Sequence, residues 1–347
     1  MHKNCSEPIT SPSLRLHWVD LLRGICMLAI LYDHTEIYYT GTNIIDYNAY
    51  VVDALIVFFF LSGYLFFKAQ EFNLWHKLHS ILRGLVIPYF FFTTVIALPK
   101  ALVHNENFEI ESIAENILLG NASWFVAALI VAELLFALIL QVFKDKVFPI
   151  VLLSCLCFIA SVWLPRSGQP YPWNIDNALQ AVLFLCGGYY FHRYEQFLSH
   201  WLSVKYVVLA LTLLVLLKAI VYIHGDSLMV YPIAISNYPA YLLNAFLAVW
   251  FLVGLSRLLP HCSIIEWTGQ RSIVYYFFCG GVPLLISRMV NSVGLAYSGH
   301  YIRIIVVFII VYLLTSAIAW FVYRFMPCII GKKRKKHNSL LNNNMLM

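Results

Sequence analysis

The chain has 347 residues, of which 61% are hydrophobic and only 12% are charged. Soluble domains carry about 25% charged residues, so this composition excludes an ordinary soluble protein and predicts an integral membrane protein. The net charge of +6 does not indicate nucleic-acid binding, because the basic residues are scattered between apolar runs. Their one cluster, at positions 332–336, is typical of a topological anchor at a membrane surface.

Ten segments are apolar enough, and of suitable length, to be transmembrane helices. Residues 1–16 are polar, and no small-residue cleavage site follows the first apolar stretch, so we expect that stretch to stay in the protein. Spanning ~30 Å of hydrocarbon takes about 20 residues. Runs of this kind lie at 18–39, 49–67, 81–99, 124–143, 147–164, 176–192, 204–223, 239–259, 271–290 and 303–325. Pro88 and Pro283 fall inside two of them, where we expect kinks.

The predicted fold is therefore all-α and polytopic, with about ten transmembrane helices. One transmembrane domain is expected at 18–325, between a cytoplasmic N-terminal segment at 1–17 and a basic, polar cytoplasmic tail at 326–347. An even number of spans places both termini on one side, and the positive-inside rule identifies that side as the cytoplasm. In this orientation the cytoplasmic side collects 18 basic residues and the outer side four, Lys100, Arg166, Arg288 and Arg303. Lys218 remains, and we expect it to snorkel toward the outer face.

The eight cysteines predict neither a disulfide framework nor a metal site. Five of them lie inside apolar runs, where the usual role is that of a small buried residue: Cys26, Cys155, Cys157, Cys186 and Cys279. The pair at 155 and 157 has no nearby histidine and no second cysteine pair, so its spacing does not fit a zinc site. We therefore expect no bound metal.

The first predicted helix holds five ionisable residues, Asp20, Arg23, Asp33, His34 and Glu36. Such groups are costly inside a membrane and mark functional sites by default. Arg23 and His34 are eleven residues apart, which puts them within about 20° of each other around the helix and roughly 16 Å apart along its axis. They therefore share one face. Glu36 projects to nearly the opposite side from His34, and Asp33 lies about 100° away.

Five segments of the sequence are informative because of their order and spacing along the chain. They are the Arg23-to-His34 stretch, residues 58–64 (FFFLSGY), 83–89 (RGLVIPY), 124–133 (WFVAALIVAE) and 269–275 (GQRSIVY). Together they resemble the motifs of the acyltransferase type 3 family, bacterial membrane proteins that acylate cell-surface and exported glycans. The resemblance covers roughly residues 18–325. One departure is Cys279, which stands where the ninth-helix motif of the family usually has a histidine, so no second catalytic histidine is assigned.

The resemblance implies an enzyme that moves an acyl group, most often acetyl, from cytoplasmic acyl-CoA to a hydroxyl of a cell-surface or lipid-linked glycan. The implied location is the bacterial cytoplasmic membrane. A sugar hydroxyl needs a base to attack a thioester, and an imidazole suits this task, so His34 is the expected base. A carboxylate on the other ring nitrogen would hold the tautomer. Glu133, near the middle of the fourth predicted helix, is the first candidate for it, and Asp33 is the alternative.

Coenzyme A carries phosphates, which require cations at the cytoplasmic face. Arg23 and Arg83 lie at cytoplasmic helix ends in the predicted topology, and a guanidinium group matches phosphate oxygens in bidentate fashion. Arg271 is the third candidate.

Other functions stay open at this point. Buried charge and ten spans also fit a transporter or flippase for a lipid-linked sugar or acyl donor, although no repeated halves are evident. The Cys279 departure leaves room for a catalytically inactive relative that binds glycan or partners. Within an enzyme, the hydroxyl attacks directly with His34 as base, or His34 first takes the acyl group. The sequence identifies neither the acceptor sugar nor the acyl chain, and it leaves a homo-oligomer open.

Overall fold

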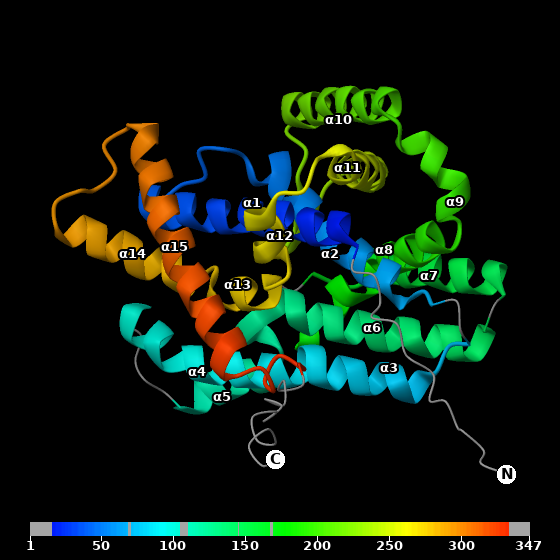
Figure 1. Cartoon of the computed structure of the whole chain (residues 1–347), viewed down its shortest axis with the longest axis horizontal. Helices are drawn as coiled ribbons and strands as arrows, with labels where there is room; N and C mark the ends of the chain where they lie inside the picture. The colour runs from blue at the N-terminus through cyan, green and yellow to red at the C-terminus, as the bar shows by residue number, and fades with distance from the viewer. Residues whose placement is uncertain (1–15, 69–70, 105–109, 145, 167–168, 333–347) are drawn as a thin grey trace, which may run out of the picture.

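The computed structural model describes residues 16–68, 71–104, 110–144, 146–166 and 169–332, which form a bundle of helices with one small hairpin (Figure 1). The α-helices are α1 (His17–Thr40), α2 (Tyr47–Phe66), α3 (Leu74–Ile81), α4 (Ile87–His104), α5 (Ile110–Leu118), α6 (Trp124–Phe143), α7 (Val147–Trp163), α8 (Ile175–Arg193), α9 (Glu195–Leu198), α10 (Val204–His224), α11 (Tyr238–Leu258), α12 (Ser263–Gly269), α13 (Ser272–Phe278), α14 (Gly281–Ser292) and α15 (Tyr301–Phe325). Other helical turns are the π-turn η1 (Leu82–Val86) and the 3-10 turns η2 (Asn121–Ser123), η3 (Pro172–Asn174) and η4 (Ser199–Leu202). The antiparallel hairpin consists of β1 (Leu228–Val230) and β2 (Ile233–Ile235).

Every predicted transmembrane segment coincides with a helix or a pair of helices. Six helical segments among the described residues are long and apolar enough to cross a membrane, and the bent pair α13 and α14 makes a seventh. Helix α7 is apolar but has 17 residues, while α1 and α8 contain buried polar residues that lower their hydropathy. The all-α polytopic membrane fold is confirmed. The count of ten spans and the cytoplasmic termini stay predictions.

The two predicted flanking segments fall mostly outside the described residues. The structure begins at Leu16 and ends at Lys332, so the segment 1–17 and the tail 326–347 are described only at their inner ends. The basic residues at 333–336 also lie outside the described part. The predicted domain boundaries therefore stay predictions.

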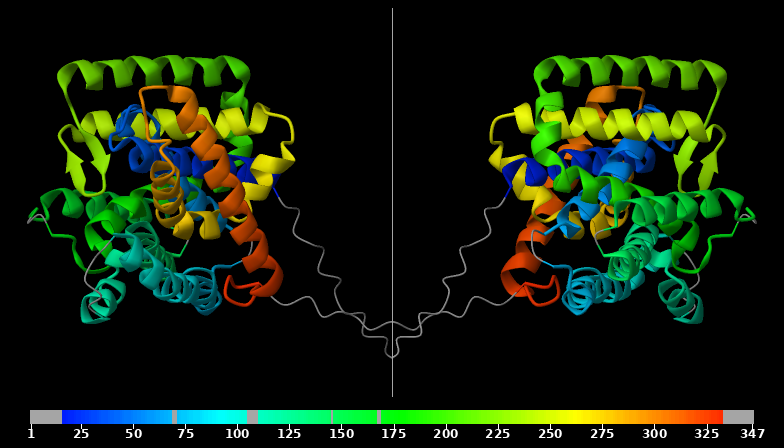
Figure 2. Two further views of the ribbon diagram at one scale, coloured as in Figure 1. Left: turned by 90° about the vertical axis from the view of Figure 1, so that its left-hand side faces the viewer. Right: turned by 90° about the vertical axis from the view of Figure 1, so that its right-hand side faces the viewer.

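Helix α1 runs through the interior of the bundle. In both Figure 1 and Figure 2, α10 and α11 lie at one edge and α3, α4 and α5 at the opposite edge, with α1 and α2 between them. This position explains how α1 can carry its charges. Asp20, Asp33 and Glu36 are each no more than 5% exposed, so they face protein rather than lipid.

Two glycines bring α12 directly against the N-terminal half of α1. A Cβ at Gly24 would lie 2.0 Å from the carbonyl oxygen of Ile265, and a Cβ at Gly269 would lie 1.8 Å from that of Asp20. Only glycine allows two helix backbones to approach so closely. Helix α12 is therefore held at one position on α1, and Arg271 follows two residues after this contact.

The two predicted kinks take different forms. Helices α13 and α14 meet at 49°, with the break at Cys279 and Gly280. Pro283 follows in the first turn of α14, where its missing N–H loses no helical hydrogen bond. The predicted helix that contains Pro88 starts earlier than expected, with α3, and continues through the π-turn η1 into α4. In a regular α-helix the ring of Pro88 would clash with the carbonyl of Gly84. Gly84 lies inside the wider π-turn, which removes this clash.

Lys218, expected to extend toward the outer face, contacts residues in the first half of α2, and its direction relative to the membrane stays a prediction. Its ammonium group donates to the carbonyl of Asn48 at 2.8 Å and lies 2.9 Å from the carboxylate of Asp53. Asn244 donates to the same carboxylate at 2.7 Å. Asp53 is 5% exposed, and a buried negative charge needs a paired cation, which Lys218 supplies. This network ties α10 and α11 to α2.

Candidate active site

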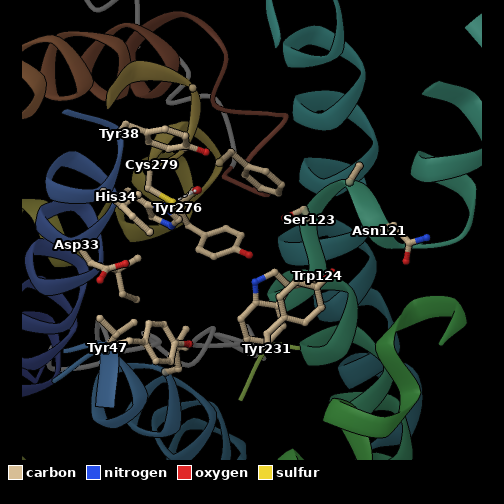
Figure 3. Close-up of a pocket in the computed structure, with 18 of the residues that line it drawn as sticks. Asp33, His34, Tyr38, Tyr47, Asn121, Ser123, Trp124, Tyr231, Tyr276 and Cys279 are labelled. Atoms are coloured by element: carbon tan, nitrogen blue, oxygen red, sulfur yellow. Dashed lines mark hydrogen bonds between the residues drawn. The ribbon is translucent and has the colours of Figure 1, made fainter. Parts of the chain in front are cut away.

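A cavity of about 1120 Å³ lies beside the C-terminal half of α1 (Figure 3). Its walls come from α1, α2, α4, α5, the start of α6, the turn of the β1–β2 hairpin and the break between α13 and α14. Segments that are distant in sequence thus surround one space. In the predicted orientation, α1 runs outward from the cytoplasm, so the cavity occupies the outer half of the membrane.

His34 extends from α1 into this cavity (Figure 3). The side chain is half-buried, and its ring lies 6.1 Å from the ring of Tyr38, with an angle of 18° between the planes. Among the described residues, neither imidazole nitrogen has a hydrogen-bond partner. Both nitrogens are therefore available to a bound substrate, as a general base requires.

The two acidic residues in the second half of α1, Asp33 and Glu36, have different surroundings. Asp33 lines the same cavity and accepts a hydrogen bond from Asn43 Nδ2 at 3.1 Å. The Glu36 carboxylate accepts hydrogen bonds from the backbone N–H groups of Ile44 and Ile45, both at 3.0 Å. Glu36 therefore holds the α1–α2 loop, as its phase on the helix allows, whereas Asp33, like Asp46 at the start of α2, lines the cavity that holds His34.

The structure pairs Glu133 with a different residue from the predicted one. Its carboxylate lies 3.0 Å from the ammonium group of Lys77 and accepts a short hydrogen bond from the hydroxyl of Ser62. Lys77 also lies over the ring of Phe66, 3.4 Å from its centroid. Glu133 is not among the residues that line the His34 cavity. The predicted contact with His34 is not formed, because α3 begins earlier than expected and brings a cation to this carboxylate.

Arg23 lies on the same helix as His34 but outside the cavity. On α1 the cavity lining begins at Ile30, about 10 Å of helix rise beyond Arg23. The buried side chains of Cys26 and Met27 occupy the intervening turns. The shared helix is as predicted, but this cavity does not join the two residues.

Arg83 and Arg271 are linked through the C-terminal end of α15. The Arg271 guanidinium lies 5.1 Å from the centroid of the Tyr323 ring, and the Lys332 ammonium lies 4.4 Å from the same centroid. The preceding residue, Gly331, packs against the backbone of Arg83. These contacts gather three basic residues around one helix end, and Arg83 and Arg271 are two of the three arginines predicted to bind phosphate.

Most of the aromatic lining of the cavity is not evident from the sequence. Trp124 and Tyr231 stack with ring centroids 4.4 Å apart and planes at 1°, and Figure 3 shows them across the cavity from His34. Tyr276 lies between this stacked pair and His34, and its hydroxyl accepts a hydrogen bond from the N–H of Phe125 at 3.2 Å. Trp124 begins one of the matched segments, whereas Tyr231 lies in a predicted loop and carries no sequence signal.

The break between α13 and α14 also faces the cavity, through Cys279, Gly280 and Gly281. A Cβ at Gly280 would find no atom nearer than the hydroxyl of Tyr38, at 3.9 Å. The first amides of a helix have no acceptor within that helix, and they carry the positive end of its dipole. The start of α14 therefore has N–H groups without an acceptor in that helix, and Gly281, its first residue, lines the cavity that His34 enters.

Comparison with known protein families gives a match over nearly the whole chain. The acyltransferase domain model of the acyltransferase type 3 family matches residues 16–324. This range contains His34, the cavity and all three candidate arginines. No match was found among curated proteins or among solved structures. The chain therefore belongs to the acyltransferase type 3 family and is a multi-pass membrane acyltransferase.

Proposed function

We propose that this acyltransferase moves an acyl group, acetyl by preference, from cytoplasmic acyl-CoA to a hydroxyl of a cell-surface or lipid-linked glycan at the bacterial cytoplasmic membrane. The proposal rests on the position of His34. Its imidazole extends into a large cavity, has no hydrogen-bond partner among the described residues, and lies beside the buried carboxylate of Asp33. An unpaired imidazole in such a space is suited to take a proton from a hydroxyl nucleophile.

His34 acts in one of two ways that give the same products. In direct transfer, it takes the hydroxyl proton while the sugar oxygen attacks the thioester carbonyl carbon. The carbon–sulfur bond breaks, and the imidazolium returns the proton to the departing thiolate. In stepwise transfer, an imidazole nitrogen first takes the acyl group and releases the coenzyme A thiol. The sugar hydroxyl then takes the acyl group from His34. Both routes yield an O-acyl sugar and free coenzyme A.

Two features of the cavity support the charges that form during transfer. Asp33 is adjacent to His34 in sequence and lines the same space, so its negative charge favours the imidazolium. The amides at the start of α14, around Gly280 and Gly281, are donors for the oxyanion of the tetrahedral intermediate. Asp33 takes the role that the sequence suggested first for Glu133.

The cavity has the size and lining for a sugar acceptor. Pockets that hold one drug-sized molecule measure about 300–1,000 Å³, so a volume of about 1120 Å³ has room for an acyl group and a sugar together. The stacked rings of Trp124 and Tyr231 offer an apolar surface to a sugar face.

Acyl-CoA, the donor, enters from the cytoplasmic side, opposite the side on which the sugar acceptor binds. Arg23, Arg83 and Arg271 are proposed to bind the phosphates of acyl-CoA at the cytoplasmic face, where guanidinium groups give bidentate contacts. The extended pantetheine arm then covers the roughly 16 Å of rise between Arg23 and His34. Because the cavity lining on α1 begins at Ile30, this arm must displace the side chains packed around Met27.

Acyl transfer in isolated membranes tests the proposal. Membranes that contain the protein are supplied with labelled acetyl-CoA and a glycan or lipid-linked sugar, and label is expected on the acceptor. His34→Ala should lower the rate by at least about 100-fold, the contribution of a general base, at unchanged abundance and insertion. His79→Ala is the control, since the His79 ring is exposed and hydrogen-bonds the carbonyl of Trp75 in its own helix. Equal transfer by the two variants would contradict the proposal.

A further inference from the structure

Two histidines and a glutamate that are far apart in the sequence meet at the N-terminal end of α1. His17 is the first residue of α1, His261 lies in the loop between α11 and α12, and Glu266 lies in α12. The imidazole rings of the two histidines have centroids 3.9 Å apart. One donor atom from each of the three residues lies within 4.8 Å of the other two. The packing of α12 on α1 therefore creates a cluster of three potential metal ligands.

The distances within this cluster leave one nitrogen unsatisfied. His261 Nδ1 lies 3.0 Å from Glu266 Oε1, which is hydrogen-bond length. His17 Nδ1 lies 3.8 Å from the same oxygen, and it is buried without a hydrogen-bond partner among the described residues. A buried nitrogen without a partner is unfavourable. Two ligands on one tetrahedral zinc ion, with bonds of about 2.0–2.2 Å, lie roughly 3.3–3.5 Å apart. The observed nitrogen–oxygen separations of 3.0 Å (His261 to Glu266) and 3.8 Å (His17 to Glu266) lie just below and just above this range.

We propose that His17, His261 and Glu266 bind a divalent transition metal ion, Zn²⁺ by the chemistry of the three ligands. Imidazole nitrogens and carboxylate oxygens are both zinc ligands, and an ion would satisfy the unpaired nitrogen of His17. The His261 side chain is 69% exposed, so water can reach the ion and complete a four-coordinate site. The sequence predicts no such site, because residues 17 and 261 become neighbours only through the α1–α12 contact.

The metal site would act as a clamp on that contact. Gly24 and Gly269 already hold α12 against α1 without intervening side chains, and the cluster closes the N-terminal end of the same interface. Arg23 on α1 and Arg271 just after α12 flank this interface. An ion at the cluster would therefore hold the two arginines at a constant separation. The metal site itself does not depend on the proposed acyl transfer.

Zinc binding by the full-length protein tests this proposal. The protein is reconstituted in lipid nanodiscs, stripped with a chelator and titrated with Zn²⁺ in competition with a chromophoric zinc indicator. We expect one equivalent to bind. His261→Ala and Glu266→Gln should each weaken zinc affinity at least tenfold. His79→Ala, which removes an exposed histidine outside the cluster, is the matched control and should bind as the unaltered protein does.

Cobalt gives a second readout that does not rely on the variants alone. Co²⁺ bound to the unaltered protein should show the intense visible bands of four-coordinate cobalt, and His261→Ala should lack them. His261 is largely exposed, so this variant is expected to fold, and its elution from a sizing column and its thermal transition check that. Zinc affinity unchanged in both cluster variants, or lost equally in the control, would overturn the proposal. Because no acyl substrate is present, failure here would leave the acyltransferase proposal untouched.

Discussion

Glu133 and Lys77 form an ion pair with little exposure to solvent. The two side chains are 10% and 18% exposed, and their charged atoms lie 3.0 Å apart. Ser62 donates a hydrogen bond to the same carboxylate. The three residues belong to α2, α3 and α6, so the pair joins three helices. A buried carboxylate that is already neutralised by a lysine has a structural role that does not require contact with substrate.

Glu133→Gln is therefore expected to destabilise the protein. Removing one partner of a buried pair costs about 3–5 kcal/mol, because the remaining charge is left unpaired. Unfolding of the purified protein in detergent should show this loss, and the double variant Glu133→Gln, Lys77→Met should recover most of it. A Glu133→Gln variant that unfolds normally but has lost acyl transfer would instead show that Glu133 takes part in the chemistry.

The relative placement of Arg23 and His34 could be predicted from the sequence, whereas the pairing of Glu133 with Lys77 could not. The relation of Arg23 to His34 follows from helical periodicity, and α1 is indeed one continuous helix over this range. The Lys77–Glu133 pair depends on where α3 begins and how it packs on α6. A sequence places a helix end within a few residues only, and it does not specify which faces of two helices meet. Lys77 falls between the predicted spans 49–67 and 81–99, so its pairing with Glu133 has no sequence signal.

At the scale of the elements, the break between α13 and α14 places a glycine at the wall of the cavity that His34 enters. Gly280 lines the cavity, and a Cβ there would meet only the Tyr38 hydroxyl, at 3.9 Å. Gly280→Ala should therefore be tolerated. Gly280→Phe should fill part of the cavity and lower acyl transfer at least tenfold at similar thermal stability. Assays of both variants in the same membranes check this, and full activity of Gly280→Phe would show that substrates do not use this space.

Close packing of α2 on α8 gives a second test at this scale. A Cβ at Gly188 would lie 1.9 Å from the carbonyl oxygen of Phe60, whereas a Cβ at the neighbouring Gly187 has 4.0 Å to its nearest atom. Gly188→Ala is expected to destabilise the protein by about 1–3 kcal/mol, the usual cost of overpacking. Gly187→Ala should change stability little. Unfolding in detergent compares the two, and equal stabilities would contradict the described helix interface.

The helices were largely predictable and the hairpin was not. A run of about 20 apolar residues has few alternatives in a membrane, so each predicted segment has a helical counterpart. The β1–β2 hairpin is short and lies in an expected loop. Its position depends on distant side chains, since Asn177 donates to the carbonyl of Val230 at 2.6 Å and Asn48 accepts from the N–H of Leu228 at 3.1 Å. Such contacts, which bring Tyr231 into the cavity, have no local sequence signature.

At the scale of the whole molecule, the proposed acyl transfer requires the arginines at the cytoplasmic end and the cavity in the outer half of the membrane. Cys328 is exposed after α15, on the expected cytoplasmic side. In a variant that keeps this cysteine alone, an impermeant maleimide should label inside-out vesicles and spare intact spheroplasts. A cysteine introduced by Ser298→Cys, in the exposed loop between α14 and α15, should show the reverse. Labelling of Cys328 in intact spheroplasts, together with labelling of Ser298→Cys in inside-out vesicles, would contradict the orientation.

We propose that the transfer of an acyl group from a cytoplasmic donor to a glycan depends on His34. Mass spectrometry of surface polysaccharides tests it most directly, in cells that lack the gene and carry either the unaltered copy or His34→Ala at matched abundance. We predict that the unaltered copy restores an acyl-sized mass increase on a specific glycan and that His34→Ala does not. Restoration of the same acylated glycan by His34→Ala, or identical glycans in cells with and without the gene, would contradict the account.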